Sequence, residues 1–152
     1  MPIIALPIDP DGAFVQVCVH LSAPKIQALQ QAKQPLPPPV VAKGLIDTGA
    51  TCTAIDTTIV QKLGLAPTGM VPIVTPSTGA APHLANQYDV SVSFTHSPGL
   101  GLPPTVHPIH FVLAVIEANL LAQGFEALIG RDILERCLLV YNGTTKQFSL
   151  SY

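Results

Sequence analysis

The stretch Leu45-Ile46-Asp47-Thr48-Gly49-Ala50 places one carboxylate at the end of an apolar run, followed by a small hydroxyl residue and a glycine. The apolar run begins at Val40 and predicts a strand over residues 40–46. Charged residues make up only 11% of the chain, so a carboxylate in this context is costly unless hydrogen bonds hold it. Asp47 is therefore the first candidate for chemistry. For the bare tripeptide the alternative is a turn, in which Asp accepts local backbone N–H bonds and Gly supplies a positive φ.

A second motif, Ala127-Leu128-Ile129-Gly130-Arg131-Asp132-Ile133-Leu134, combines an apolar pair with a glycine that opens a short helix. In order and separation, the two motifs together resemble those of the retropepsin-like aspartic proteases, the single-lobe family that includes retroviral proteases and their cellular and bacterial relatives. The resemblance covers residues 13–152. Retroviral members carry an acidic residue shortly after the Asp-Thr-Gly-Ala string, which pairs with the helix arginine. Thr51 and Cys52 stand there in this chain, so the resemblance leaves Arg131 without its usual partner.

This resemblance implies a mainly β fold: a closed barrel or sandwich with one or two short helices, a flap hairpin over the substrate, and a two-fold dimer. It makes Asp47 the catalytic residue. It assigns support of the active-site loop to Thr48, Gly49 and Ala50, with Thr48 bonding across the dimer axis. The structural motif that it implies comprises Ile129, Gly130, Arg131 and Asp132. The implied flap, for which an ordinary hairpin end is the alternative, comprises Thr75, Pro76, Ser77, Thr78, Gly79 and Ala80.

The lone Asp-Thr-Gly of this chain bears on its oligomeric state. Hydrolysis of a peptide bond by carboxyl groups needs two of them. One is ionised and takes a proton from the attacking water, and the other is protonated and polarises the scissile carbonyl. The chain holds a single Asp-(Thr/Ser)-Gly, whereas a two-fold dimer places Asp47 opposite its own copy. We therefore expect a homodimeric aspartic endopeptidase that acts on a peptide or protein without a metal or other cofactor. We also expect residues 1–6, residues 147–152, or both at the dimer interface.

Two other classes of function remain open at this point. The same fold can serve as a catalytically inactive dimerisation or peptide-binding module that has kept the Asp turn, and the missing acidic partner of Arg131 favours that alternative. The chain can also be a scaffold domain excised from a larger polyprotein. Activity towards a mixed peptide library separates the first alternative from an enzyme.

Bulk composition narrows the classes of partner. The length of 152 residues predicts one domain over residues 1–152, with a Pro-rich surface excursion over residues 22–39. The net charge of −2 argues against nucleic-acid binding through phosphates. The mean hydropathy is +0.46, but no run of about 18 unbroken apolar residues occurs, so we expect a buried subunit interface rather than a membrane segment. The N-terminus lacks the features of a signal peptide.

The remaining side chains with known chemistry support simpler explanations. The three cysteines are far apart in the sequence and form no Cys-x-x-Cys, which indicates reduced thiols and a cytoplasmic protein. His107 and His110 have a spacing that suggests a metal site, but residues three apart on a strand point to opposite faces. We therefore predict no metal.

Local patterns also predict several elements. Helical spacing predicts a helix over residues 56–63, with Gly64 as its C-cap. The dipeptide Asn142-Gly143 predicts a hairpin between two C-terminal strands. Further strands are expected over residues 71–75, 88–94 and 109–116, and a short helix over residues 131–137.

Overall fold

The structure is a computed structural model that describes residues 2–74, 81–96, 105–106 and 109–152. Strands dominate it, in the order β1 (Ile3–Pro7), β2 (Phe14–Leu21), β3 (Val40–Ile46), β4 (Ala54–Asp56), β5 (Gly69–Ile73), β6 (His83–His96), β7 (Thr105–Val106), β8 (Phe111–Ala118), β9 (Ala127–Ile129), β10 (Leu138–Asn142) and β11 (Gln147–Ser151). The helices of the described part are α1 (Ala23–Gln31), α2 (Thr57–Leu63), α3 (Arg131–Leu134) and the short 3-10 helix η1 (Leu121–Gln123).

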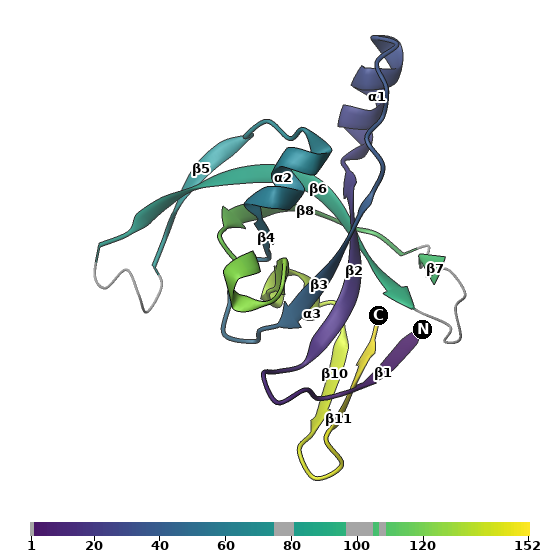
Figure 1. The fold of residues 1–152 in the computed structure, drawn as a ribbon, viewed down its shortest axis with the longest axis vertical. Helices are drawn as coiled ribbons and strands as arrows, with labels where there is room; N and C mark the ends of the chain where they lie inside the picture. Colours follow the sequence, from purple (N-terminus) through teal and green to yellow (C-terminus); the bar gives the residue numbers. More distant parts are fainter. Residues whose placement is uncertain (1, 75–80, 97–104, 107–108) are drawn as a thin grey trace.

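Six of the strands close into a barrel. Their order is β2-β3-β9-β4-β8-β6, and β6 pairs again with β2 (Figure 1). The pairs β3–β9 and β4–β8 are parallel, and the other neighbouring pairs are antiparallel. This closed, mainly β architecture confirms the expected fold class. Its described part carries three short α-helices where one or two were expected, because the excursion after β2 contains α1.

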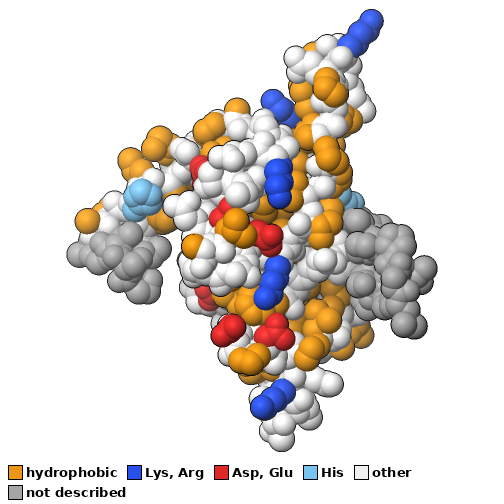
Figure 2. All heavy atoms as spheres, in the orientation of Figure 1, with side chains coloured by type: hydrophobic (Ala, Val, Ile, Leu, Met, Phe, Trp, Pro, Cys, Tyr) orange, Lys and Arg blue, Asp and Glu red, His pale blue; other side chains and the backbone are white. Residues whose placement is uncertain are grey.

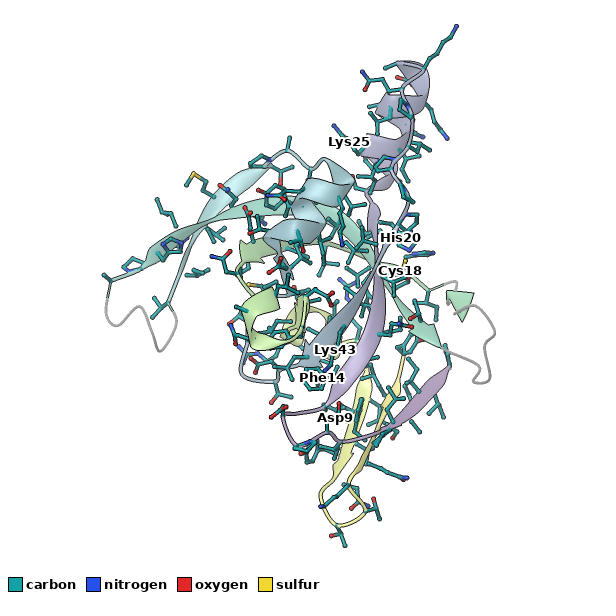
Figure 3. The ribbon with its side chains drawn as sticks, in the orientation of Figure 1. Asp9, Phe14, Cys18, His20, Lys25 and Lys43 are labelled. Atoms are coloured by element: carbon teal, nitrogen blue, oxygen red, sulfur yellow. The ribbon has the colours of Figure 1, made fainter. Side chains whose placement is uncertain are left out.

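Alternating side chains of the barrel strands fill its interior. Val17 on β2, Ile55 on β4 and Phe94 on β6 are fully buried members of the main apolar cluster. On the outside of the β2–β3 pair, Lys43 Nζ lies 3.8 Å from the centre of the Phe14 ring (Figure 3). The apolar run before Asp47 therefore becomes a strand because the barrel buries one of its faces, where Ala42 and Gly44 lie.

The two ends of the chain meet in a second, three-stranded sheet with the order β1-β11-β10 (Figure 1). The hairpin β10–β11 turns at the predicted Asn142-Gly143, where the Asn142 side chain accepts bonds from the backbone of Thr144 and Thr145. One face of this sheet packs Phe148 and Leu150 into the protein. The strands that we expected at a dimer interface thus pair with each other within one chain.

The surface excursion over residues 22–39 departs from the barrel between β2 and β3. Its helix α1 has no buried residue and projects away from the body of the molecule (Figure 1). Figure 2 shows charged side chains scattered between larger apolar and uncharged areas on the face in view. Among the described residues, no helix is both long and apolar enough to span a membrane.

Helix α2 follows β4 directly and ends at the predicted C-cap, while Asp56, expected as its first residue, caps its N-terminus. Asp56 is the N-cap, and Gly64 ends the helix in a left-handed conformation with φ of 59°. Asp56 is only 3% exposed. Its carboxylate accepts bonds from the Thr58 backbone and hydroxyl at 2.9 and 2.8 Å and from the backbone N–H groups of Leu120 and Leu121, both at 2.8 Å. One buried charge therefore joins β4, α2 and η1.

Burial raises the pKa of Asp56, but the hydrogen bonds from Thr58, Leu121 and Leu120 outweigh it and lower that pKa to about 2. The ionised carboxylate therefore stabilises the fold at neutral pH, and this contribution is lost as the pH falls from about 4 towards 2.

We predict that Asp56→Asn lowers the free energy of unfolding at pH 7 by about 2 kcal/mol, because the amide cannot serve all four donors as an acceptor. The difference from wild type should shrink as the pH falls to 2. Urea unfolding at pH 7, 4 and 2 measures this, with the exposed Asp89→Asn as the control. An equal difference at all three pH values would contradict the assignment.

Candidate active site

Asp47 lies directly after β3, at the place where the two sequence motifs meet. Ile46 pairs with Ile129 in the parallel β3–β9 ladder, and the Asp47 backbone N–H donates to the Ile129 carbonyl at 3.0 Å. The side chain of Asp47 is half-buried. The pairing of two strands far apart in the sequence thus fixes the backbone that carries this carboxylate.

The Asp-Thr-Gly loop is a tight turn around the Asp47 carboxylate. The Gly49 N–H donates to Asp47 Oδ1 at 2.8 Å, and the Ala50 N–H donates to the Asp47 carbonyl at 3.3 Å. Gly49 has no positive φ. A Cβ on Gly49 would lie 3.1 Å from Asp47 Oδ1, so glycine serves here to let the N–H approach the carboxylate. Thr48 and Gly49 themselves are exposed.

Arg131 connects the start of α3 to this loop. Its backbone N–H donates to the Ala50 carbonyl at 3.0 Å, and its guanidinium donates to the Thr48 carbonyl at 3.3 Å and to the Thr51 hydroxyl at 3.2 Å. Thr51 therefore occupies the place where an acidic partner was missing. The contact is a hydrogen bond to a neutral group, which is weaker than a charge-assisted pair.

A second connection runs through Thr53, which the sequence analysis did not single out. Its backbone N–H and hydroxyl donate to the two carboxylate oxygens of Asp132 at 2.8 and 2.7 Å, and its hydroxyl accepts from the Gly130 N–H at 3.1 Å. Thr53 is fully buried. In the sequence, the hydroxyl of Thr53 stands between an exposed loop and the apolar Ala54-Ile55. Its role as a hydrogen-bond partner can be inferred only once Asp132 is known to face it.

The structure therefore brings together Asp47, the loop residues Thr48 to Ala50 and the motif from Ile129 to Asp132. The predicted flap residues, Thr75 to Ala80, lie outside the described residues. A smaller apolar cluster packs beside the loop and contains Leu45, Cys52 and Leu128 as partly buried members. No three His, Cys, Asp or Glu side chains come together as a metal site among the residues that the structure describes.

Gly130 gives a direct test of how closely the two motifs pack. A Cβ at this position would lie 2.5 Å from the Cys52 carbonyl carbon and 2.9 Å from the Thr53 nitrogen. We predict that Gly130→Ala lowers the free energy of unfolding by about 1–3 kcal/mol, because the backbone must shift. Chemical denaturation measures this, with Gly143→Ala as the matched control, since no atom lies within 4 Å of a Cβ there. Equal stability of the two variants would refute the packing argument.

Comparison with known proteins adds evidence on the fold. No protein-family profile and no curated protein sequence matches this chain. Among solved structures, the chain is similar to a retropepsin-like aspartic protease from Rickettsia conorii, with a TM-score of 0.56, 19% sequence identity, and coverage of 99% of this chain and 91% of that one.

A second structure is more distant. It is the retroviral protease-like domain of Ddi1 from Leishmania major, with a TM-score of 0.36, 16% identity, and coverage of 86% of this chain and 82% of that one. The first match spans nearly the whole length of both chains and shows the fold. The chain has the retropepsin-like fold.

Proposed function

We propose that this protein is an aspartic endopeptidase in which Asp47 from each of two subunits forms the catalytic pair. The observation that carries the proposal is the setting of the Asp47 carboxylate. One oxygen accepts the Gly49 N–H, while no described residue donates to the other oxygen. A half-buried carboxylate on a hydrogen-bonded loop, with one oxygen that accepts no bond from a described residue, is suited to hold and transfer a proton.

In this mechanism the paired carboxylates divide the work. The ionised Asp47 takes a proton from the water that attacks the scissile carbonyl. The protonated Asp47 of the other subunit polarises the carbonyl oxygen and later protonates the leaving nitrogen. Two carboxylates about 3 Å apart share one proton, because both cannot easily be ionised. The Gly49 N–H keeps each carboxylate oriented through the cycle.

The other carboxylates of the described chain support the need for a second subunit. Asp132 is occupied by Thr53, and Asp56 is buried beneath α2 and η1. Asp9, Asp11 and Asp89 are exposed outside the Asp47 loop. Within one chain, none of these aspartates is placed to serve as the partner of Asp47, and a two-fold axis supplies that partner as a second Asp47.

The terminal sheet offers a surface for such a dimer. On its outward face, Ile3 is 65% exposed, Leu138 58% and Val140 50%. These three residues lie on two strands that flank β11, in register with Ser151 and Ser149. β1 and β10 are also the edge strands of this sheet. A second copy would cover both the apolar face and an open edge.

We predict that Asp47→Asn abolishes peptide hydrolysis, with a loss of at least about a thousandfold in kcat/KM, because the amide preserves shape but cannot transfer the proton. A mixed peptide library with mass-spectrometric detection measures cleavage, and circular dichroism verifies the fold. Full activity of Asp47→Asn would refute the proposal. Peptide binding without cleavage by the wild type would favour an inactive binding module instead.

We further predict that catalysis needs two intact subunits. When wild-type and Asp47→Asn chains are refolded together at constant total concentration, activity should fall with the square of the wild-type fraction, so an equal mixture should keep about a quarter of it. The control is the exposed Asp89→Asn, whose mixtures should keep full activity. A linear fall with the Asp47→Asn fraction would show that each chain works alone.

A further inference from the structure

A pocket of about 370 Å³ lies between the turn-side part of the β5–β6 hairpin, the end of β8 and the start of α2. Its polar wall includes Glu117, Asn86, Thr57 and Asn119, and its apolar wall includes Ile73 and Ala85. The size is near the lower end of the range for ligand pockets, about 300–1,000 Å³. None of its lining residues belongs to the Asp47 loop or to the motif from Ile129 to Asp132.

Glu117 is the charged group of this pocket. Its Oε2 accepts a bond from the Tyr88 hydroxyl at 2.8 Å and from the Asn86 amide at 3.2 Å. The hydrogen bond from Tyr88 lowers the pKa of Glu117, burial opposes that shift, and Asn86 and Thr57 lower the pKa further. The pKa of Tyr88 is raised by burial and by the same bond, so the proton stays on the phenol. Glu117 is therefore an ionised, oriented carboxylate.

This carboxylate has no cationic partner among the described residues. None of the groups that shift its pKa is a lysine or arginine, and the single charged group among them is Asp56, which is also negative. The lining of the pocket contains no lysine or arginine, and its other titratable side chain is His83, which is exposed. A half-buried anion with neutral donors on one oxygen leaves acceptor positions open for a cation.

The pocket shares two lining residues with the apolar cluster beside the Asp47 loop. Ile73 and Ala85, which line it, belong to the same apolar cluster as Leu45 and Cys52. Leu45 precedes Asp47 by two residues, and Cys52 follows the Asp-Thr-Gly loop. A peptide that passes Asp47 along this cluster can therefore place one of its side chains in the pocket.

We propose that this pocket is a substrate subsite for a cationic side chain, a lysine or arginine, whose charge pairs with Glu117. The apolar stem of such a side chain would pack on Ile73 and Ala85, as long basic side chains commonly do. The amide oxygens of Asn86 and Asn119 offer further acceptors for its N–H groups. This inference rests on the proposed function, since it names the class of peptide that the same cleft selects.

The first experiment measures binding and does not need catalysis. Fluorescence anisotropy measures the affinity of Asp47→Asn protein for two series of short, otherwise uncharged peptides. In the first series a single lysine is placed at each position in turn. In the second series norleucine replaces that lysine. Norleucine keeps the apolar stem of lysine and removes only the charge. We expect lysine at one position to strengthen binding by about tenfold, because a hydrogen bond to a charged group is stronger than one between neutral groups and part of the gain is lost to solvent.

The second experiment assigns the effect to Glu117. In the Asp47→Asn background, Glu117→Gln keeps an acceptor for Tyr88 and Asn86 but removes the charge, so the preference for lysine should fall to within about twofold while norleucine peptides bind as before. Glu135→Gln removes the same charge from an exposed position after α3 and should keep the preference. Glu117→Lys should reverse it in favour of a glutamate at the same position, with circular dichroism to verify the fold.

The outcomes separate this inference from the proposed function. Charge-dependent binding that Glu117→Gln removes supports the subsite even if the wild type cleaves no peptide. Cleavage of the library by the wild type, without a lysine or arginine preference at any position, overturns the subsite and leaves the protease intact. Absence of binding to every peptide, or a preference that survives Glu117→Gln, also overturns it.

Discussion

The carboxylate of Asp132 holds the arrangement of the candidate site together. It accepts both the backbone N–H and the hydroxyl of Thr53, and Thr53 in turn accepts the Gly130 N–H. These bonds lock the strand after the Asp-Thr-Gly loop against the helix that follows β9. If they were absent, the Asp47 loop would be held only by the Ile129 carbonyl on one side and by the exposed Arg131 on the other. A catalytic loop must be positioned to within tenths of an ångström. The buried bonds between Thr53 and Asp132 therefore fix the loop more firmly than the exposed bonds of Arg131.

Elements with local signals could be predicted from the sequence. The strand before Asp47 was expected over residues 40–46 and is β3. The helix between Asp56 and Gly64 and the turn at Asn142 also lie where they were expected, because caps and tight turns depend on a few neighbouring residues. The fold class came from two motifs and their resemblance to a family. Elements without such signals had less accurate bounds: the strand expected over residues 88–94 is β6, which runs from His83 to His96.

The interactions that make the site could not be read from sequence, because they join residues far apart along the chain. The role of Thr53 depends on Asp132, and the partner of Arg131 is the hydroxyl of Thr51 in place of an acid. The Glu117 pocket likewise needs the pairing of β6 with β8, which brings Gln87 opposite Ile116 and so places Asn86 beside Glu117. Which strands pair with each other cannot be predicted from this single sequence.

The way this chain stabilises its carboxylates has a consequence for its ligands. Asp56, Asp132 and Glu117 are each held by N–H and hydroxyl donors of the protein, and none of their hydrogen bonds in the described chain comes from a lysine or arginine. Their negative charges are thus oriented but not neutralised. Charges in a concave, partly apolar surface act over a longer range than charges in open solvent. Under the proposed function, the uncompensated charge of Glu117 would favour basic peptides over acidic ones before any direct contact forms.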